Sequence, residues 1–206
     1  MIPKVIHYCW FGRNPLPKSA LKCIDSWRKF FPDYEIKEWN EDNFDVNIIK
    51  YTQDAYNAKK YAFVSDYARI WILYNCGGVY FDTDVEVISP MIDIIEKGPF
   101  MGFEINNSTE NKIAVNPGLG IGSPSRLELY KDILDVYSNL NFWIGSKINL
   151  YAIVRITTDI LTINGLKNVD GAQTVNGTTI YPSEFFNPLD SLTGRLNKTA
   201  NTRTIH

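Results

Sequence analysis

The residues best suited to chemistry are two aspartates, Asp82 and Asp84, which follow the apolar run VYF in the stretch GGVYFDTDV. On an extended strand, side chains at positions i and i+2 point the same way, so the two carboxylates would share a small space. Carboxylates this close repel each other and raise one pKa unless a cation neutralises them. A hard divalent ion, Mg²⁺ or Mn²⁺, that also binds a substrate phosphate resolves the conflict. The pair therefore predicts a metal–phosphate site; the alternative is a solvated acidic turn.

A second group of functional side chains is predicted on the helix that precedes this strand. Asp66, Arg69 and Leu73 stand at i, i+3 and i+7, which places them on one helix face. Leu73 can pack inward while Arg69 reaches a diphosphate or a sugar hydroxyl and Asp66 accepts hydrogen bonds from hydroxyls. The alternative is a surface ion pair, worth only about a few tenths of a kcal/mol.

The elements that must position these residues open with a β-α-β unit. The run KVIHYCWFG is a β-branched and aromatic strand that ends at Gly12, and YEIKEWN is a second strand. Between them a helix is predicted, stopped by Pro32 and Asp33. This order favours a right-handed crossover and parallel pairing. The apolar residues at helical spacing are Leu21, Ile24, Trp27 and Phe31.

The rest of the chain alternates helices and strands. A helix is predicted from Thr52 to Asn75, with a break near Phe63 and a C-cap at Gly77 and Gly78. We predict one α/β domain over residues 1–206, with a mixed, mostly parallel sheet flanked by helices. The further strands are expected at 79–84, 85–89, 99–104 and 116–124, and the further helices at 126–137 and 147–162.

Composition narrows the class of protein. The 206-residue chain is 45% hydrophobic and 14% aromatic, enough for a sizeable core, and its net charge of −2 does not resemble that of nucleic-acid binders. Its three cysteines lack CxxC spacing, which argues against a disulfide framework or a zinc site. No signal peptide is recognisable, and no run reaches the roughly 20 apolar residues that cross a bilayer. We expect a cytoplasmic protein with no nucleic-acid partner.

Two motifs resemble those of retaining glycosyltransferases with a DXD motif. This group includes fungal initiating mannosyltransferases, bacterial capsular polysaccharide glycosyltransferases and the glucosyltransferase domains of large clostridial toxins. The stretch AFVSDYARIWILYNCGGVYFDTDV resembles their signature A-x-x-S-D-x-x-R-…-G-G-x-Y-x-D-x-D, and IPKVIHYCWFG resembles their opening. The resemblance implies a GT-A fold with a Rossmann-like nucleotide-binding half. It also implies transfer of a hexose from a nucleotide-sugar, a UDP-sugar being favoured, to a saccharide acceptor with retention, in surface or capsular polysaccharide synthesis.

Carried over residue by residue, the resemblance implies roles for five side chains. Trp10 matches the aromatic residue that stacks on the nucleobase, and an indole at the end of the first strand suits a flat base. An ordinary core tryptophan is the alternative. Asp66 and Arg69 match the pair that holds the donor sugar. Asp82 matches the first DXD aspartate, near ribose and metal, and Asp84 the direct ligand of Mn²⁺ or Mg²⁺.

Three residues outside these motifs are weaker candidates. Asn116, in AVNPGLGIGSP, resembles an Asn that approaches the reacting sugar. Asp159, in ITTDILT, matches a segment that often reads T-G-P in relatives. Thr158 and Asp159 stand here in place of that Gly and Pro, so an acceptor-side role for Asp159 would depart from the family pattern. Relatives continue past I-H into a segment that ends in Ser-Trp and closes over the diphosphate. Here the sequence stops at His206, so we expect that segment to be missing. His206 itself is a candidate metal or phosphate contact. The glycines that fit close backbone approach, or equally a twisted edge strand, are Gly118, Gly120 and Gly122.

These considerations give a candidate mechanism and its rivals. No protein nucleophile is recognisable, so we expect same-face attack of the acceptor assisted by the leaving phosphate. The rivals are a non-catalytic nucleotide-sugar or carbohydrate-binding relative, and a haloacid-dehalogenase-type phosphatase, whose motif wants Thr or Val at Glu86. Acceptors of this group are often lipid-linked, so peripheral attachment to the inner face of a membrane fits, although no amphipathic basic helix indicates it. His7 is interpreted as a buried structural histidine.

Overall fold

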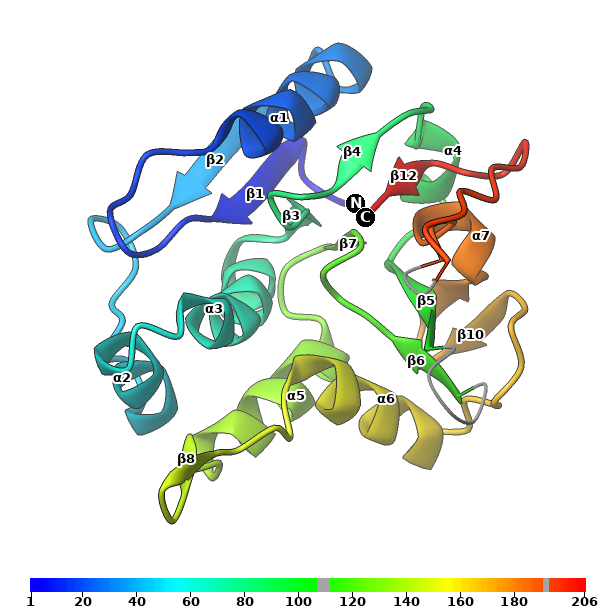
Figure 1. Cartoon of the computed structure of the whole chain (residues 1–206). Coiled ribbons are helices and arrows are strands. Elements are labelled where there is room, and N and C mark those ends of the chain that lie inside the picture. Colours follow the sequence, from blue (N-terminus) through cyan, green and yellow to red (C-terminus); the bar gives the residue numbers. More distant parts are fainter. Residues whose placement is uncertain (107–111, 191–192) are drawn as a thin grey trace.

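The computed structural model describes residues 1–106, 112–190 and 193–206. A central sheet carries helices on both of its faces (Figure 1). The helices are α1 (Lys18–Phe30), α2 (Lys50–Asn57), α3 (Tyr61–Cys76), α4 (Ile92–Ile95), α5 (Glu128–Ser138), α6 (Ile153–Ile163) and α7 (Ser183–Phe186). The strands are β1 (Val5–Cys9), β2 (Glu35–Trp39), β3 (Gly78–Tyr80), β4 (Glu86–Val87), β5 (Phe100–Asn106), β6 (Lys112–Val115), β7 (Ile121–Ser123), β8 (Trp143–Ile144), β9 (Lys147–Ile148), β10 (Gln173–Val175), β11 (Thr178–Tyr181) and β12 (Thr204–Ile205).

The main sheet has the strand order β10-β11-β5-β7-β3-β1-β2, with β6 paired to β5. β1 pairs in parallel with β2 and β3, and β11 pairs in parallel with β5. The pairs β3–β7, β5–β7, β5–β6 and β10–β11 are antiparallel. The predicted mixed sheet is confirmed, but "mostly parallel" is wrong. After β5 the chain returns as β6 and then β7 without the long crossover that parallel pairing requires.

The opening β-α-β unit is confirmed, with β1 and β2 in parallel register from Val5↔Glu35 onward. The buried face of α1 differs by one position from the prediction. Leu21 is 44% exposed, whereas Ala20, Cys23, Ile24 and Trp27 are buried. Trp27 also donates its indole N–H to the carbonyl of Val85, 2.8 Å away, and so ties α1 to the chain that follows the two aspartates.

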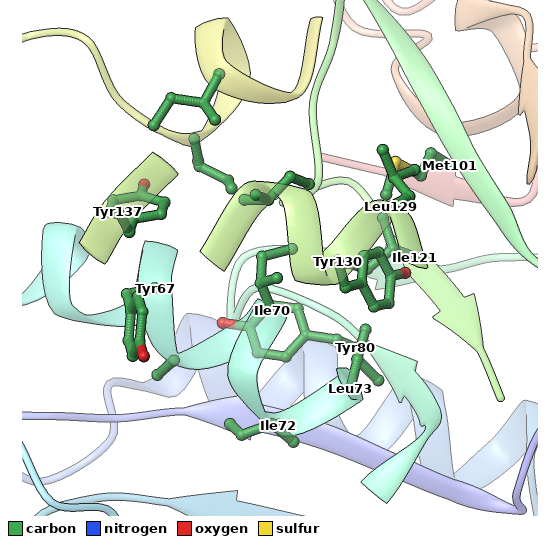
Figure 2. Close-up of a cluster of buried hydrophobic side chains, with 14 of the residues drawn as sticks. Tyr67, Ile70, Ile72, Leu73, Tyr80, Met101, Ile121, Leu129, Tyr130 and Tyr137 are labelled. Carbon is green, nitrogen blue, oxygen red and sulfur yellow. The ribbon is translucent and has the colours of Figure 1, made fainter. Parts of the chain in front are cut away.

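Helix α3 is the element that joins the sheet to the second helical layer. Figure 2 shows its residues Tyr67, Ile70 and Leu73 beside Tyr80 of β3 and the aromatic side chains of α5. Leu73 is fully buried, as its place on the Asp66–Arg69 face predicted. Successive side chains of β3 point to opposite faces of the sheet. Tyr80 therefore packs in the cluster with α3, whereas Val79 packs in the cluster on the other face, with α1. The core therefore holds α3 firmly over the ends of β1 and β3.

Several boundaries differ from the prediction. The strand predicted over 79–84 ends at Tyr80, and the break before α3 lies at 58–60 rather than near Phe63. Strand β7 covers only the end of the predicted 116–124, because residues 117–119 form turns and a bend. The helix predicted from Lys147 begins at Ile153, since Lys147 belongs to the β8–β9 hairpin. Within the described ranges, no helix is both long and apolar enough to span a bilayer.

Candidate functional site

The candidate site lies where β1 and β3 end, beside the first turns of α3 (Figure 1). Two cavities meet there, and both are lined by Ala62, Arg69 and Asp82. The Trp10 cavity, of about 380 Å³, is also lined by Trp10, Asn14, Ser65, Thr83 and Asp84. The Asp159 cavity, of about 760 Å³, is also lined by Asp66, Asn116, Arg155, Thr158 and Asp159.

Arg69 is the centre of the site and is only 4% exposed. Its Nη1 donates to Oδ2 of Asp82 at 2.9 Å, and its Nη2 donates to Oδ1 of Asp66 at 3.0 Å. Its Nε donates to the carbonyl of Ser65 at 3.2 Å, so every nitrogen of the guanidinium has a partner. The predicted placement of Asp66 and Arg69 on one helix face is confirmed. The alternative of a surface ion pair is wrong, because the side chains of Arg69 and Asp66 are only 5% and 14% exposed.

The charges of this cluster are strongly coupled. Burial raises the pKa of Asp66 to about 6, against the lowering effect of Arg69 and with a smaller raising effect of Asp82. Burial on its own would lower the pKa of Arg69, but Asp82, Tyr80 and Asp66 outweigh it and raise that pKa. Arg69 is therefore always a cation, and Asp66 exchanges its proton near neutral pH.

Asp82 is held on both carboxylate oxygens. Oδ2 accepts from Arg69, and Oδ1 accepts from the hydroxyl of Tyr80 at 2.9 Å. Burial, followed by the charge of Asp82, raises the pKa of Tyr80 well above its ordinary value, so the hydroxyl stays protonated as a donor. Tyr80 was not among the predicted site residues, although its position two residues before Asp82, at the end of the strand, is the signal that could have identified it.

Asp84 lies in a different environment. Because β3 ends at Tyr80, Asp84 falls in a turn, where its side chain is 72% exposed. The expectation that both carboxylates crowd together on one extended strand is therefore wrong. Oδ1 of Asp84 instead lies 3.6 Å from Nε2 of His206, which β12 carries to this turn by pairing with β4.

Asp84 and His206 are the side chains that fit the predicted divalent ion. The parts of the chain that the structure describes contain no group of three or more His, Cys, Asp or Glu residues that could hold a metal. Mg²⁺ and Mn²⁺ bind through one or two carboxylates and complete their coordination with water and substrate phosphates. An exposed carboxylate with an imidazole beside it fits an ion of that kind, held jointly by the protein and a diphosphate.

Asn116 closes the site from the side of the β6–β7 turn. Its Oδ1 accepts from the backbone N–H of Gly118 at 2.7 Å, and its Nδ2 donates to Oε2 of Glu104 at 3.0 Å. Gly118 approaches the charged cluster so closely that a Cβ there would lie 2.3 Å from Oδ2 of Asp82. Close backbone approach is thus confirmed for Gly118. Glu104, which fixes the orientation of the Asn116 amide, carried no signal in the sequence.

Asp159 lies apart from the two DXD aspartates, in the wall of the Asp159 cavity formed by α6. It accepts a hydrogen bond from the hydroxyl of Tyr151, whose pKa is raised by burial and by this bond. The preceding residue, Thr158, accepts from the backbone N–H of Val115 at 2.9 Å and so ties α6 to β6. The structure therefore places Asp159 across the cavity from the Arg69 cluster.

Trp10 is half-buried at the end of β1 and lines the Trp10 cavity, so it is not an ordinary core residue. Its indole N–H donates to the carbonyl of Asn14 at 2.6 Å, which fixes the plane of the ring. The loop is anchored by Glu41, whose Oε1 accepts from the N–H of Gly12 at 2.6 Å and from the hydroxyl of Tyr56 at 2.9 Å. Glu41, in the acidic loop after β2, was not predicted as part of the site.

His7, the neighbour of Trp10 in the motif, is a structural residue, as interpreted from the sequence. Its Nδ1 accepts from the indole N–H of Trp39 at 3.0 Å, so Nε2 carries the proton and donates to the carbonyl of Gly77 at 2.9 Å. Burial lowers the pKa of His7 to about 4, which keeps the ring neutral.

Comparison with known proteins relates the first half of the chain to a described family. Residues 17–101 match the family "Glycosyltransferase sugar-binding region containing DXD motif". Inositol phosphoceramide mannosyltransferase 1 of Schizosaccharomyces pombe (strain 972 / ATCC 24843) is 30% identical over 111 residues, which are 48% of this chain and 33% of the relative. Inositol phosphoceramide mannosyltransferase 3 of the same organism is 30% identical over 92 residues, 41% of this chain and 24% of the relative. The chain thus spans a third or less of the curated relatives that it matches.

Solved structures extend the likeness to the fold. The PaToxG glycosyltransferase superposes with a TM-score of 0.60 at 19% identity, covering 79% of this chain and 69% of that chain. A glycosyltransferase involved in the glycosylation of the major capsid of PBCV-1 superposes with a TM-score of 0.54 at 10% identity, covering 99% of this chain and 93% of that chain. At these identities the likeness concerns the fold alone, and it confirms the predicted GT-A arrangement.

Proposed function

Because residues 17–101 match the glycosyltransferase sugar-binding region that contains a DXD motif, we propose that this chain transfers a hexose from a nucleotide-sugar to a saccharide acceptor. The observation that carries the proposal is the Arg69 cluster, a buried charged wall between two cavities that share Arg69 and Asp82. A wall of this kind separates a donor site from an acceptor site and leaves one point of contact between them. The donor we favour is a UDP-sugar.

The Trp10 cavity takes the nucleotide in this proposal. Trp10 presents an indole face whose plane is fixed by its bond to Asn14, which suits stacking on a flat base. Arg69 and Asp66 bind the sugar hydroxyls at the junction of the cavities, one as a fixed cation and the other as an acceptor. Asp82, which accepts a hydrogen bond on each oxygen, keeps Arg69 in place.

The diphosphate lies at the turn of Asp84. Asp84, with His206 beside it and Asp82 more indirectly, would hold Mn²⁺ or Mg²⁺ together with the phosphates. When bound, such an ion offsets the negative charge that develops on the leaving diphosphate. The exposed position of Asp84 leaves its carboxylate free to approach that ion, which the fully bonded Asp82 is less able to do.

The acceptor enters the Asp159 cavity. Its hydroxyl oxygen forms the new bond to the anomeric carbon on the face from which the sugar–phosphate bond breaks, and its proton passes to the leaving phosphate oxygen. In this proposal Asp159 and Asn116, which both line the cavity, bind acceptor and sugar hydroxyls. The two curated relatives are named inositol phosphoceramide mannosyltransferases, and the lipid in that name supports a lipid-linked acceptor. We place this transfer in surface-polysaccharide synthesis, in the cytoplasm at the inner face of a membrane.

Thermal unfolding with a panel of nucleotide-sugars, each with and without Mn²⁺, tests the donor site. We expect one nucleotide class to stabilise the wild type in a Mn²⁺-dependent way, by about 2.7 kcal/mol at about 100 times its Kd. Asp84→Ala should lose this shift. Asp25→Ala is the matched control, because its side chain is 71% exposed, against 72% for Asp84, and lies in an ion pair on α1.

Turnover is measured on the same proteins as release of nucleoside diphosphate with a saccharide acceptor. Donor binding with turnover supports the transferase. Binding without turnover across a broad acceptor panel would favour the non-catalytic nucleotide-sugar-binding alternative, and no binding to any donor would overturn the proposal.

A further inference from the structure

The β8–β9 hairpin is an apolar projection at the periphery of the molecule, beyond the end of α5 (Figure 1). Trp143 is 40% exposed and Ile144 is 64% exposed. The preceding residue, Phe142, is fully buried and packs edge-on against Tyr51, with ring centroids 5.6 Å apart. The N–H of Asn149 donates to the carbonyl of Phe142 at 2.8 Å and closes the base. The hairpin is therefore anchored on the core and still turns two large apolar side chains to solvent.

The charge around the hairpin has one sign along the chain. Between Asp135 and Asp159 the sequence contains no acidic residue and two cations, Lys147 and Arg155, both exposed. The chain as a whole carries a net charge of −2, so this segment differs from the average of the protein. Exposed Trp and Ile beside Lys and Arg is the side-chain combination that suits an anionic lipid headgroup region.

The apolar surface continues into the Asp159 cavity. Leu150, two residues after β9, is 80% exposed and lines that cavity together with Ile153 and Val154. Arg155 lines it as well. A molecule lying along this path would meet the apolar hairpin at one end and the Arg69 cluster at the other.

We propose that the β8–β9 hairpin binds the surface of an anionic lipid bilayer, with Trp143 and Ile144 in the headgroup region and Lys147 against the phosphates. Resting on the proposed function, this orientation opens the Asp159 cavity toward the bilayer, where a lipid-linked acceptor can enter past Leu150. A second protein copy is a poorer occupant, because a stable protein interface takes about 20–30 residues a side and the hairpin is a short projection.

Sedimentation of the full chain with phosphatidylcholine vesicles, with and without phosphatidylglycerol, tests the proposal. We expect binding to the anionic vesicles and a loss of about tenfold or more for the double variant Trp143→Ser/Ile144→Ser, whose lost apolar burial sets that scale. The matched control is Ile163→Ser/Val169→Ser, which removes two side chains that are 85% and 60% exposed outside the hairpin. Lys147→Glu leaves the apolar pair intact and should weaken binding to the anionic vesicles only.

Circular dichroism and the nucleotide-sugar melting shift are recorded on every variant. The proposal is supported if the hairpin variant keeps its fold and its melting shift with nucleotide-sugar but no longer binds the vesicles. That result also shows that donor binding does not depend on membrane binding. The proposal is overturned if the wild type does not bind anionic vesicles, or if the hairpin variant binds them as well as the control variant does. It is also overturned if the hairpin instead mediates a monomer–dimer equilibrium.

Discussion

Asp82 and Asp84 are separated by a single residue, and they differ in solvent exposure and in hydrogen bonding. Asp82 accepts hydrogen bonds on both oxygens, from Arg69 and from Tyr80, and its side chain is 26% exposed. Asp84 is 72% exposed, and its Oδ1 lies 3.6 Å from Nε2 of His206. The difference arises because β3 ends at Tyr80, so one aspartate closes the buried cluster and the other turns outward. A paired-carboxylate motif can thus combine a hydrogen-bonded, largely buried carboxylate with an exposed one.

The largest expected effect comes from removing the cation of the buried cluster. Arg69→Met leaves Asp66 and Asp82 without their partner, and breaking a buried ion pair in this way costs about 3–5 kcal/mol of unfolding free energy. Urea unfolding measures the loss. Arg28→Met is the control, since that exposed pair with Asp25 should contribute at most about 0.5 kcal/mol. Equal stabilities of the two variants would contradict the picture of a buried charged wall.

The next effect is a dependence on pH that belongs to Asp66. Its pKa is raised from an ordinary value near 3.8 to about 6, so between these values the folded chain binds more protons than the unfolded chain. Stability contributed by the protonated form is therefore lost as pH rises through this window. We expect the wild type to lose about 2–3 kcal/mol relative to Asp66→Asn over that range. Urea unfolding of both proteins at a series of pH values checks this, and parallel curves would refute it.

Gly118→Ala should lower the free energy of unfolding by a smaller amount, because it disturbs the buried cluster around Asp82. The new Cβ would meet Oδ2 of Asp82 at 2.3 Å and push the carboxylate from Arg69, at a cost of about 1–3 kcal/mol. Gly171→Ala is matched to it, because neither glycine has a positive φ and the nearest atom to a Cβ at Gly171 is 4.0 Å away. Thermal unfolding compares them. If Gly118→Ala melts like Gly171→Ala, the approach is looser than described.

The smallest effect on the free chain is expected at the exposed aspartate. Asp84→Asn should change the unfolding free energy by no more than about 0.5 kcal/mol, because its side chain has little packing to lose. Its Mn²⁺-dependent stabilisation by nucleotide-sugar should nevertheless disappear. Calorimetry with and without the metal checks both statements, and a destabilised free protein would erase the contrast with Asp82.

The sequence predicted the elements whose signals are local. The structure contains the predicted first strand, although it ends at Cys9 rather than Gly12, the helix spacing that aligns Asp66 with Arg69, and the Gly77 end of α3. These features depend on periodicity and capping within a few residues of each other, which a single sequence records directly. They predicted that Asp66 and Arg69 share a helix face near the strand end, but not that Arg69 contacts Asp82.

The rest depends on contacts between distant segments. The carboxylate of Asp82 turns toward Arg69 because α3 passes over the end of β3. The sequence pattern VYFDTD does not show that strand pairing stops at Tyr80. Glu41, in a loop, and Glu104, in β5, hold the Trp10 loop and Asn116 through single hydrogen bonds across the fold, which no local pattern records. The two-residue strands β8, β9 and β12 are too short for any periodicity to mark them.

The pairing of β12 with β4 has a consequence for the order in which the site is assembled. The turn of Asp84 leaves the ribosome well before β12, which lies far downstream in the sequence. The Arg69 cluster draws its side chains from α3 and the neighbouring strand end, and can form during synthesis. His206 reaches Asp84 only when β12 docks on β4, through a contact of long sequence separation that forms slowly. The nascent chain would then bury the charges of the Arg69 cluster before the surroundings of Asp84 are complete.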